Sequence, residues 1–488
     1  MLKVDKGPTG IASRRESMHM STLTFLGAVG EVTGSRYLFE VDGEQGPHRL
    51  LLECGLHQGG ADADRANEKP FGKLVKELEA VVLSHGHLDH SGLLPKLVRE
   101  GYRGPIHCTR GTRDLLEIML QDAAFVMAKD IEWENKWRSR HDRPLVEPLY
   151  DLDDVAQTLA QCVSHPYGQP VTLPGGVTLV FRDAGHILGS AIVELGVPSG
   201  GQEKRLVFSG DLGNPSSVLM KDPEKLYEAD LVLMESTYGD RDHRPLEETL
   251  EEFAGVLEQA HADGGNVLIP AFAVGRSQEI LYHLSVLYHE GRLRQQMVFL
   301  DSPMAIRVTE LYHRARKALD PEDLKVLNKA ASGDPGQYLP VLRMTRTVEE
   351  SMAINRIHGG AIIIAGAGMC NGGRIVHHFR YNLEKPATRL VIVGFQAGGT
   401  IGRQIVDGAE RIRVFGHDLA VKARVHTIGG FSAHAGQSQL IGWAGAFRNR
   451  PRLYLVHGEP ETQKVLQAAL AESEIEAQIP AYGDRIEL

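Results

Sequence analysis

The stretch HGHLDH at residues 85–90 places three imidazoles and one carboxylate directly after the apolar run AVVLS. Alternate side chains of an extended chain point the same way, so we expect His85, His87 and Asp89 to converge. His90 is expected to turn away as a helix begins. Imidazole and carboxylate together suit zinc or a similar borderline metal. A lone histidine after a strand is usually structural, but four ligand-type residues in six positions indicate a metal site.

Further candidate ligands follow other predicted strands. RDAGHILGSA ends a strand at His186, and LVFSGDLGN ends one at Asp211. Asp211 taken alone is equally typical of a turn or a helix cap. Together with HGHLDH these residues predict two metals: three histidines on one, Asp89 and His90 on the other, and a carboxylate that bridges them. His457 in YLVHGEPE offers a sixth ligand at another strand end.

Length and composition indicate a protein of two or three domains, because 488 residues exceed one ordinary domain. The four cysteines include no C-x-x-C pair, a pattern typical of reduced cytosolic proteins. The chain shows neither a signal-peptide pattern nor an apolar run long enough for a membrane span. We therefore expect a soluble, cytoplasmic protein without membrane contacts. Residues 1–20 are polar and patternless, and we expect a loose, disordered extension there.

A formal net charge of −10 disfavours nucleic-acid binding through bulk surface charge, although it leaves a local basic cleft open. Short apolar runs such as RLLLEC, AVVLSH, RLVFSGD and ADLVLMEST read as buried strands. Helical patterns, including 92–100 and 112–128, lie between several of them. This mixture predicts an α/β layered sandwich whose loops at strand ends carry function.

From about Pro245 the pattern changes to a regular alternation of helices and strands. Helices are expected at 246–262, 276–290, 304–318 and 373–382, with strands NVLIPAF, QMVFLDS, AIIIAGAG and RLVIVGF around them. This spacing is typical of βαβ units in a parallel sheet, which predicts a second domain. From KARVHTIGG onward the sequence returns to the mixed pattern of strands and helices of the first part of the chain.

These motifs together carry a resemblance to a known family. HGHLDH, the isolated His186, Asp211 in FSGDLG and the closing VHGE resemble the metallo-β-lactamase fold. ESTYGDR, IPAFAVGRSQEIL, DSPMA, GMCNGGRI and FSAHAG resemble the β-CASP subfamily of RNA-processing nucleases, which includes the cleavage and polyadenylation endonuclease subunit and its prokaryotic relatives. The resemblance implies an αββα sandwich over 21–235 and 426–488. It also implies an inserted β-CASP cap domain, a parallel α/β sheet with flanking helices, over 236–425.

The resemblance also implies a ligand set and a reaction. His85, His87 and His186 would hold one zinc, Asp89, His90 and His457 the other, and Asp211 would be shared. Two such ions lower the pKa of a bridging water from 15.7 toward roughly 7. A metal-bridging hydroxide would then attack single-stranded RNA and leave 5′-phosphate and 3′-hydroxyl ends.

The family also assigns a proton donor for the departing 3′-oxygen. By similarity this is His434 in GGFSAHAG, oriented by Glu235 in LMESTYGD. A carboxylate beside the histidine raises its pKa and keeps it protonated as a general acid. Taken singly, Glu235 is equally well a strand-end carboxylate and His434 a loop histidine. Their occurrence with seven ligand candidates favours the catalytic interpretation.

The run AIIIAGAGMCNGGRIVHHF has a rival interpretation as a dinucleotide fingerprint. Its spacing is G-x-G-x-x-x-G, and the next strand leads to Gln396 rather than to an acidic residue, so NAD binding is disfavoured. The turn instead suits phosphate, since backbone N–H groups lie at a helix start. A lone arginine more often decorates a helix, but the resemblance favours RNA contacts. The predicted contacts are Arg276, Arg374, His377 or His378, Arg403 and Ser432.

One position departs from the family pattern. Glu53 in LLLECGLHQGG stands where the family has an aspartate that supports the metal loop. Because glutamate is longer by one methylene, the support is either rebuilt or weakened.

Two alternatives to the ribonuclease remain open at this point. The same metal fold could hydrolyse small esters, thioesters or lactams, and the chain could be an inactive scaffold that binds RNA or a partner. The large cap disfavours the first alternative, and the complete ligand set disfavours the second. Internal cutting, 5′-exonuclease action and a homodimer are not distinguished by sequence.

Overall fold

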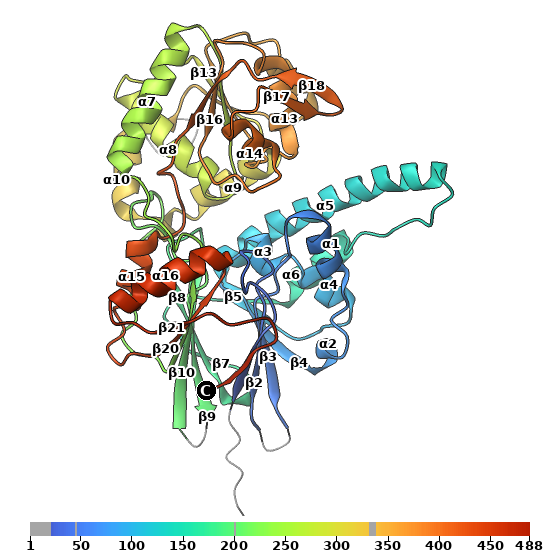
Figure 1. The fold of residues 1–488 in the computed structure, drawn as a ribbon, viewed down its shortest axis with the longest axis vertical. Helices are drawn as coiled ribbons and strands as arrows, with labels where there is room; N and C mark the ends of the chain where they lie inside the picture. The colour runs from blue at the N-terminus through green and yellow to red at the C-terminus, as the bar shows by residue number, and fades with distance from the viewer. Residues whose placement is uncertain (1–20, 44–45, 200–201, 331–337) are drawn as a thin grey trace, which may run out of the picture.

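The computed structural model describes residues 21–43, 46–199, 202–330 and 338–488, so the predicted extension over 1–20 lies outside the described residues. Two seven-stranded sheets pack face to face in the lower half of the molecule, and a third sheet forms the upper body (Figure 1). Apolar side chains from both lower sheets form a shared core between them. The expected metallo-β-lactamase sandwich with an inserted parallel α/β domain is confirmed.

The first sheet has the strand order β22-β1-β2-β3-β4-β5-β6. Its outer face is covered by helices whose apolar residues form a second core. β4 and β5 are almost wholly buried, as expected for strands covered on both faces. The strands are β22 (Arg485–Glu487), β1 (Thr22–Phe25), β2 (Tyr37–Val41), β3 (His48–Leu52), β4 (Leu78–Val82), β5 (Ile106–Thr109) and β6 (Cys162–His165). The helices on this side are α1 (Gly60–Glu68), α2 (Leu74–Glu77), α3 (Leu88–Ser91), α4 (Leu94–Arg99), α5 (Arg110–Arg140) and α6 (Leu152–Gln161).

The second sheet has the order β21-β20-β11-β10-β9-β8-β7. Two helices near the end of the chain cover its outer face, so the four layers are helix, sheet, sheet and helix. The strands are β21 (Ala477–Gln478), β20 (Arg452–Val456), β11 (Leu231–Glu235), β10 (Gln202–Phe208), β9 (Ala191–Ser199), β8 (Thr178–Asp183) and β7 (Val171–Thr172), with a short 3₁₀ turn at Pro174–Gly176. The helices are α15 (Gln437–Ala444) and α16 (Pro460–Glu472).

The third sheet has the order β14-β13-β15-β12-β16-β19, and every pair in it is parallel. Helices pack on both faces and create two separate cores. The strands are β14 (Leu342–Met344), β13 (Met297–Leu300), β15 (Ala361–Ala365), β12 (Val267–Pro270), β16 (Arg389–Ile392) and β19 (Arg424–Thr427), beside the hairpin β17 (Arg411–Val414) and β18 (His417–Ala420). The helices are α7 (Leu246–Ala262), α8 (Arg276–His289), α9 (Pro303–Arg314), α10 (Pro321–Ala330), α12 (Val348–Ile354), α13 (Gly373–Asn382) and α14 (Ile401–Val406), with a 3₁₀ turn at Arg316–Ala318.

One helix differs clearly from the expectation. The pattern predicts a helix over 112–128, whereas α5 spans 31 residues, Arg110–Arg140. The apolar periodicity stops where α5 leaves the core, but pairs such as Glu132–Lys136 and Glu134–Arg138 continue the helix. Within the described residues no helix has the length and apolar character needed to cross a membrane.

Candidate metal centre

The loop between β4 and α3 supplies one half of a ligand cluster. His85 Nε2 lies 3.0 Å from His87 Nδ1, which lies 3.3 Å from His186 Nε2 in the loop between β8 and β9. Asp211 Oδ2, after β10, lies 3.4 Å from His85 Nε2 and 3.6 Å from His186 Nε2. Four ligands at 2.0–2.1 Å from a tetrahedral zinc are separated by about 3.3 Å. The spacing therefore fits one zinc ion.

A second group adjoins the first. His90 Nε2 lies 3.2 Å from His457 Nε2, and Asp89 Oδ2 lies 3.5 Å from the same nitrogen of His457. Asp211 Oδ1 lies 3.3 Å from His90 Nε2. Asp211 thus directs one oxygen toward each group, which is the arrangement that a shared ligand requires. All seven predicted ligands meet at this edge of the two sheets.

Glycines allow the ligand loops to approach one another. A Cβ on Gly55 would lie 1.7 Å from the backbone oxygen of Asp89, so only glycine lets the end of β3 pack against HGHLDH. A Cβ on Gly213 would lie 2.0 Å from the Gly185 oxygen, beside His186. Each contact lets two segments that are distant in sequence pack closely together, so that their ligands can meet.

Burial and neighbouring charges put the first ligand group, which is His85, His87, His186 and Asp211, in the ionisation state that ligands need. At His90, by contrast, burial is outweighed by the surrounding carboxylates, which raise the pKa of that imidazole. Burial lowers the pKa of His85, His87 and His186, so their imidazoles are neutral and offer a lone pair. Burial on its own would raise the pKa of Asp211, but His457 and nearby histidines hold it well below the usual range. Neutral imidazoles and an ionised carboxylate are the forms that bind a divalent metal.

Four of the ligand histidines also hydrogen-bond outward through Nδ1. Such bonds fix the ring orientation and leave Nε2 free to face the metal, and their partners matter nearly as much as the ligands. The partners, each at 3.0 Å, are Ser84 Oγ for His85, Glu53 Oε2 for His90, the Ala433 carbonyl for His186 and Thr237 Oγ1 for His457.

Glu53 uses both carboxylate oxygens in this support. Oε1 accepts a hydrogen bond of 2.6 Å from the Ser84 backbone N–H, while Oε2 lies 3.0 Å from His90 Nδ1. The residue is fully buried and holds a left-handed backbone, with φ of 62°. The longer side chain therefore reaches the metal loop from this position.

The second predicted pair lies directly against the cluster. His434 Nδ1 lies 3.2 Å from Oε2 of Glu235, the last residue of β11, and 4.0 Å from Asp211 Oδ2. Glu235 is fully buried, and its Oε1 accepts a hydrogen bond of 2.5 Å from the Leu212 N–H. Burial alone would lower the pKa of His434, but the Glu235 carboxylate reverses this and raises it to about 9. The imidazole is therefore cationic at neutral pH.

Thr237 is a site residue that the sequence analysis missed. Its Oγ1 lies 2.5 Å from Glu235 Oε2 and 3.0 Å from His457 Nδ1. Because His457 Nε2 faces the metal group, Nδ1–H donates to Thr237, whose hydroxyl proton then points to Glu235. The signal was present in the sequence, since a residue two positions beyond a strand-end carboxylate faces the same side.

Two predicted RNA contacts lie near His434. Ser432 Oγ accepts a 3.3 Å hydrogen bond from the His434 N–H. Burial raises the pKa of Tyr238, whose ring lies 6.1 Å from that of His434, and the charge of nearby Arg276 opposes this. Arg276 donates to Glu279, and its Nε has no hydrogen-bond partner within the described residues. This unpartnered Nε is buried, so a phosphate role for Arg276 stays a prediction.

The other predicted RNA contacts are engaged elsewhere in the cap. Arg374 donates to Asp301 Oδ1 at 2.7 Å and to the Thr345 carbonyl at 3.0 Å. Arg403 pairs with Asp407 at 2.9 Å. His377 stacks on Phe415, with the ring centroids 4.6 Å apart, and its neighbour His378 bonds Asp301. None of these described contacts reaches the metal cluster, so a phosphate role for these residues stays a prediction.

Comparison with known families gives three matches along the chain. The Beta-lactamase superfamily domain matches residues 48–283, and the Beta-Casp domain matches residues 277–405. The model described as Zn-dependent metallo-hydrolase RNA specificity domain matches residues 418–480.

Individual proteins are similar over almost the whole chain. Ribonuclease TTHA0252 of Thermus thermophilus is 42% identical over 461 residues, which cover 94% of this chain and 98% of that protein. Transcription termination factor FttA of Cenarchaeum symbiosum is 30% identical over 479 residues, covering 96% of this chain and 70% of that protein. A crystal structure of a protein of unknown function from Enterococcus faecalis has a TM-score of 0.52 at 12% identity, covers 96% of this chain and all of its own, and supports the fold alone.

Proposed function

Because the chain belongs to the β-CASP family of the metallo-β-lactamase fold, a family of metal-dependent hydrolases, we propose that it is a zinc-dependent ribonuclease acting on single-stranded RNA. One observation carries the proposal. The Glu235–His434 pair lies against a seven-ligand cluster, with His434 Nδ1 only 4.0 Å from Asp211. This arrangement supports a proton donor beside a metal centre, which phosphodiester hydrolysis needs. A relative named as a ribonuclease supports the same reading.

We propose two zinc ions per chain, held by the two ligand groups with Asp211 between them. When bound, the ions supply Lewis acidity that lowers the pKa of a water to about 7 and stabilises negative charge on a phosphoryl oxygen. The ligand side chains orient this chemistry, because their outward bonds to Glu53, Thr237 and backbone groups prevent the rings from turning.

The protein's own groups complete the reaction. A water oxygen forms the new bond to phosphorus, and the bond from phosphorus to the ribose 3′-oxygen breaks. His434, protonated at neutral pH and anchored through Nδ1 to Glu235, gives the proton on its other nitrogen to that departing oxygen. The products are one 5′-phosphate and one 3′-hydroxyl end. Arg276 and Ser432 are the candidates for holding the adjacent phosphates.

Labelled RNA tests the proposal directly. We expect 5′-labelled and 3′-labelled RNAs of roughly 30 nucleotides to be cut by the purified protein and spared after treatment with a chelator. The lengths of labelled fragments distinguish internal cutting from removal of 5′ nucleotides. Cleavage that survives both chelation and the change His434→Ala would contradict the mechanism. Turnover of chromogenic esters without RNA cleavage would favour a small-substrate hydrolase, and RNA binding without any turnover would favour a scaffold.

The division of the chain is also part of this proposal. Residues 21–235 and 426–488 would form the hydrolase core and 236–425 the cap over the cleft. A cytoplasmic location and a homodimer stay predictions from the sequence.

A further inference from the structure

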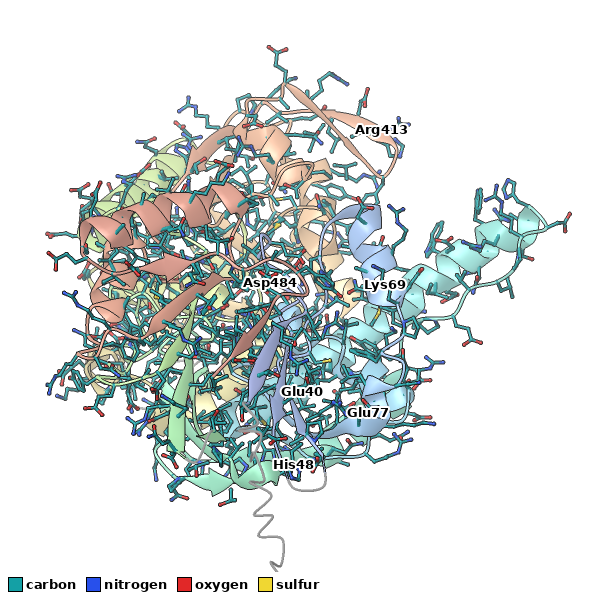
Figure 2. All side chains as sticks on the ribbon, turned by 60° about the horizontal axis from the view of Figure 1, so that its bottom comes forward. Glu40, His48, Lys69, Glu77, Arg413 and Asp484 are labelled. Atoms are coloured by element: carbon teal, nitrogen blue, oxygen red, sulfur yellow. The ribbon has the colours of Figure 1, made fainter. Side chains whose placement is uncertain are left out.

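Helix α5 begins beside the metal centre and ends far from it. Near its start the Thr112 hydroxyl donates to the Gly189 carbonyl, three residues after His186. Its last buried residue is Ala124. Met127 still packs against the core, and beyond it the helix projects from the body to its end at Arg140 as an arm, in both views (Figure 1, Figure 2). Because each helical residue rises 1.5 Å, the arm extends about 20 Å beyond Met127.

One side of the arm is supported and the other is bare. The segment after the helix returns along it, since Asn135 exchanges two hydrogen bonds of 2.9 Å with the Val146 backbone. The opposite side of the helix exposes three large apolar side chains. These are Val126 (47% exposed), Trp133 seven residues later (77%) and Trp137 four residues after that (48%). An exposed tryptophan pair on one helix face is unusual for a surface without a partner.

The tip of the arm is locally basic in an acidic protein. The eight residues 136–143, KWRSRHDR, contain four arginines or lysines and one aspartate, whereas the whole chain carries −10. Lys136 and Arg138 pair with glutamates of the helix. Arg140 and Arg143 have no ion pair within the described residues, and the Arg143 guanidinium lies 5.2 Å from the Trp137 ring centre. Two cations therefore lie beside two exposed aromatic rings, of which Trp133 has no ring partner within the described residues and Trp137 stacks on His141 with the ring centroids 4.4 Å apart.

We propose that this arm tip is a second RNA-binding element, where bases stack on Trp133 and Trp137 while Arg140 and Arg143 contact phosphates. Exposed aromatic rings beside cations are the elements that proteins use to hold single strands without sequence preference. Two unpaired cations complement the anionic RNA backbone, which favours RNA over a protein or a second copy of this chain. The inference rests on the proposed function, because that function makes RNA the ligand of this protein.

The distance along α5 sets a minimum length for an RNA that contacts both the metal centre and the arm. Leu115 packs against Gly86 of the metal loop. A Cβ added to Gly86 would lie 3.3 Å from the Cβ of Leu115. Trp133 is 18 residues farther, or about 27 Å at the helical rise. A single strand with about 3.4 Å per nucleotide needs about eight nucleotides to span that distance. Only longer RNAs reach the cleft and the arm together.

Tryptophan fluorescence offers a direct readout. The chain has three tryptophans, and the third, Trp443, is only 5% exposed. In a His434→Ala background that preserves the RNA, a single-stranded 20-mer, about 2.5 times the required length, is expected to quench the emission. Trp133→Ala with Trp137→Ala is expected to weaken binding of the 20-mer, followed through a label on the RNA, about 10-fold or more. A 6-mer, shorter than the roughly eight nucleotides that span the distance, is expected to bind both proteins equally.

The charges of Arg140 and Arg143 are tested through the salt dependence of RNA binding. Arg140→Gln with Arg143→Gln is expected to reduce the slope of log K against log salt by about 1.4, since each phosphate contact to a single strand contributes about 0.7. Tyr482→Ala and Arg450→Gln, exposed residues outside the arm, serve as controls that leave affinity and slope unchanged.

Several outcomes would overturn the inference. These are an unchanged emission on adding the 20-mer, or arm variants that bind it as tightly as the controls. A tryptophan signal that depends on protein concentration without RNA, accompanied by a larger sedimentation coefficient, would assign the arm to a protein interface. Binding at the arm is measured without turnover, so failure of the ribonuclease proposal would appear separately, as intact RNA with the otherwise unmodified protein.

Discussion

The hydroxyl of Thr237 lies 3.0 Å from Nδ1 of His457 and connects a ligand of one metal group to the carboxylate that orients the proton donor. From Thr237 the hydrogen bonds continue through Glu235 to His434. A threonine hydroxyl has one proton, so donation to Glu235 requires it to accept from His457. Thr237 and His434 therefore both donate to Glu235, and His457 presents Nε2 to Asp89 and His90.

Replacement of Thr237 tests this connection. Thr237→Val keeps the shape of the side chain but removes both hydrogen bonds, so we expect zinc at the second group to bind about 10- to 100-fold more weakly. Competition with a chromophoric chelator measures that affinity without any turnover. Thr237→Ser retains the hydroxyl and is expected to restore most of the affinity, whereas tight binding of both ions by the valine variant would contradict the assignment.

Removal of the shared carboxylate is expected to disable both groups. Asp211→Ala removes one oxygen from each ligand group, so we expect fewer than two zinc ions per chain. RNA cleavage is expected to fall by about 1,000-fold or more. Elemental analysis and a fluorescent RNA assay measure the two effects. Asp222→Ala, an exposed carboxylate in the loop before β11, is the matched control. A variant of Asp211 that retained two ions would remove the basis for a bridging role.

The protonation of His434 predicts the alkaline limb of the pH profile. Burial lowers the pKa of this imidazole, but Glu235 outweighs the effect and raises it to about 9. A general acid acts in its protonated form, so cleavage is expected to fall as pH rises through that value. His434→Ala is expected to be about 100-fold or more slower and to lose this limb. Rates measured from pH 6 to 10 decide the point, and an unchanged alkaline limb in the variant would assign it to another group.

A buried aspartate in the cap predicts how stability depends on pH. Asp301 is fully buried and accepts hydrogen bonds of 2.6–2.7 Å from Thr345, Ser351, Arg374 and His378. Burial alone would raise its pKa, but His378 and the other donors hold it at about 2. The depressed value means that the ionised form stabilises the fold above the unfolded pKa of about 3.9, by about 2 to 3 kcal/mol. The contribution is lost as pH falls toward 2.

Asp301→Asn is therefore expected to lower the thermal midpoint at pH 7, and to do so by less at pH 3. Its effect at pH 7 is expected to be about 3 kcal/mol or more, because Arg374 would lose its buried partner. Asp418→Asn in the exposed hairpin is the control in the same domain. Equal losses at both pH values would show that Asp301 acts through its shape and not its charge.

Much of the site was visible in the sequence for local reasons. HGHLDH follows a strand that is wholly apolar on its inward side, and the twofold alternation of an extended chain brings His85 and His87 to one side. His186, Asp211 and His457 each follow another apolar strand, and the ends of packed sheets meet at one edge. The resemblance to the family added the roles of Glu235 and His434.

The sequence by itself determined the ligand types, the strands they follow and the alternation of the cap, because these depend on residue order over a few positions. Tertiary structure alone decided that Thr237 links His457 to Glu235, that Arg374 is held by Asp301, and how far α5 projects. Each of these depends on which side chains meet across long separations, or on where a helix leaves the core. Local periodicity carries no information about either, since hydrogen-bond partners and free surface exist only once the sheets and helices have packed.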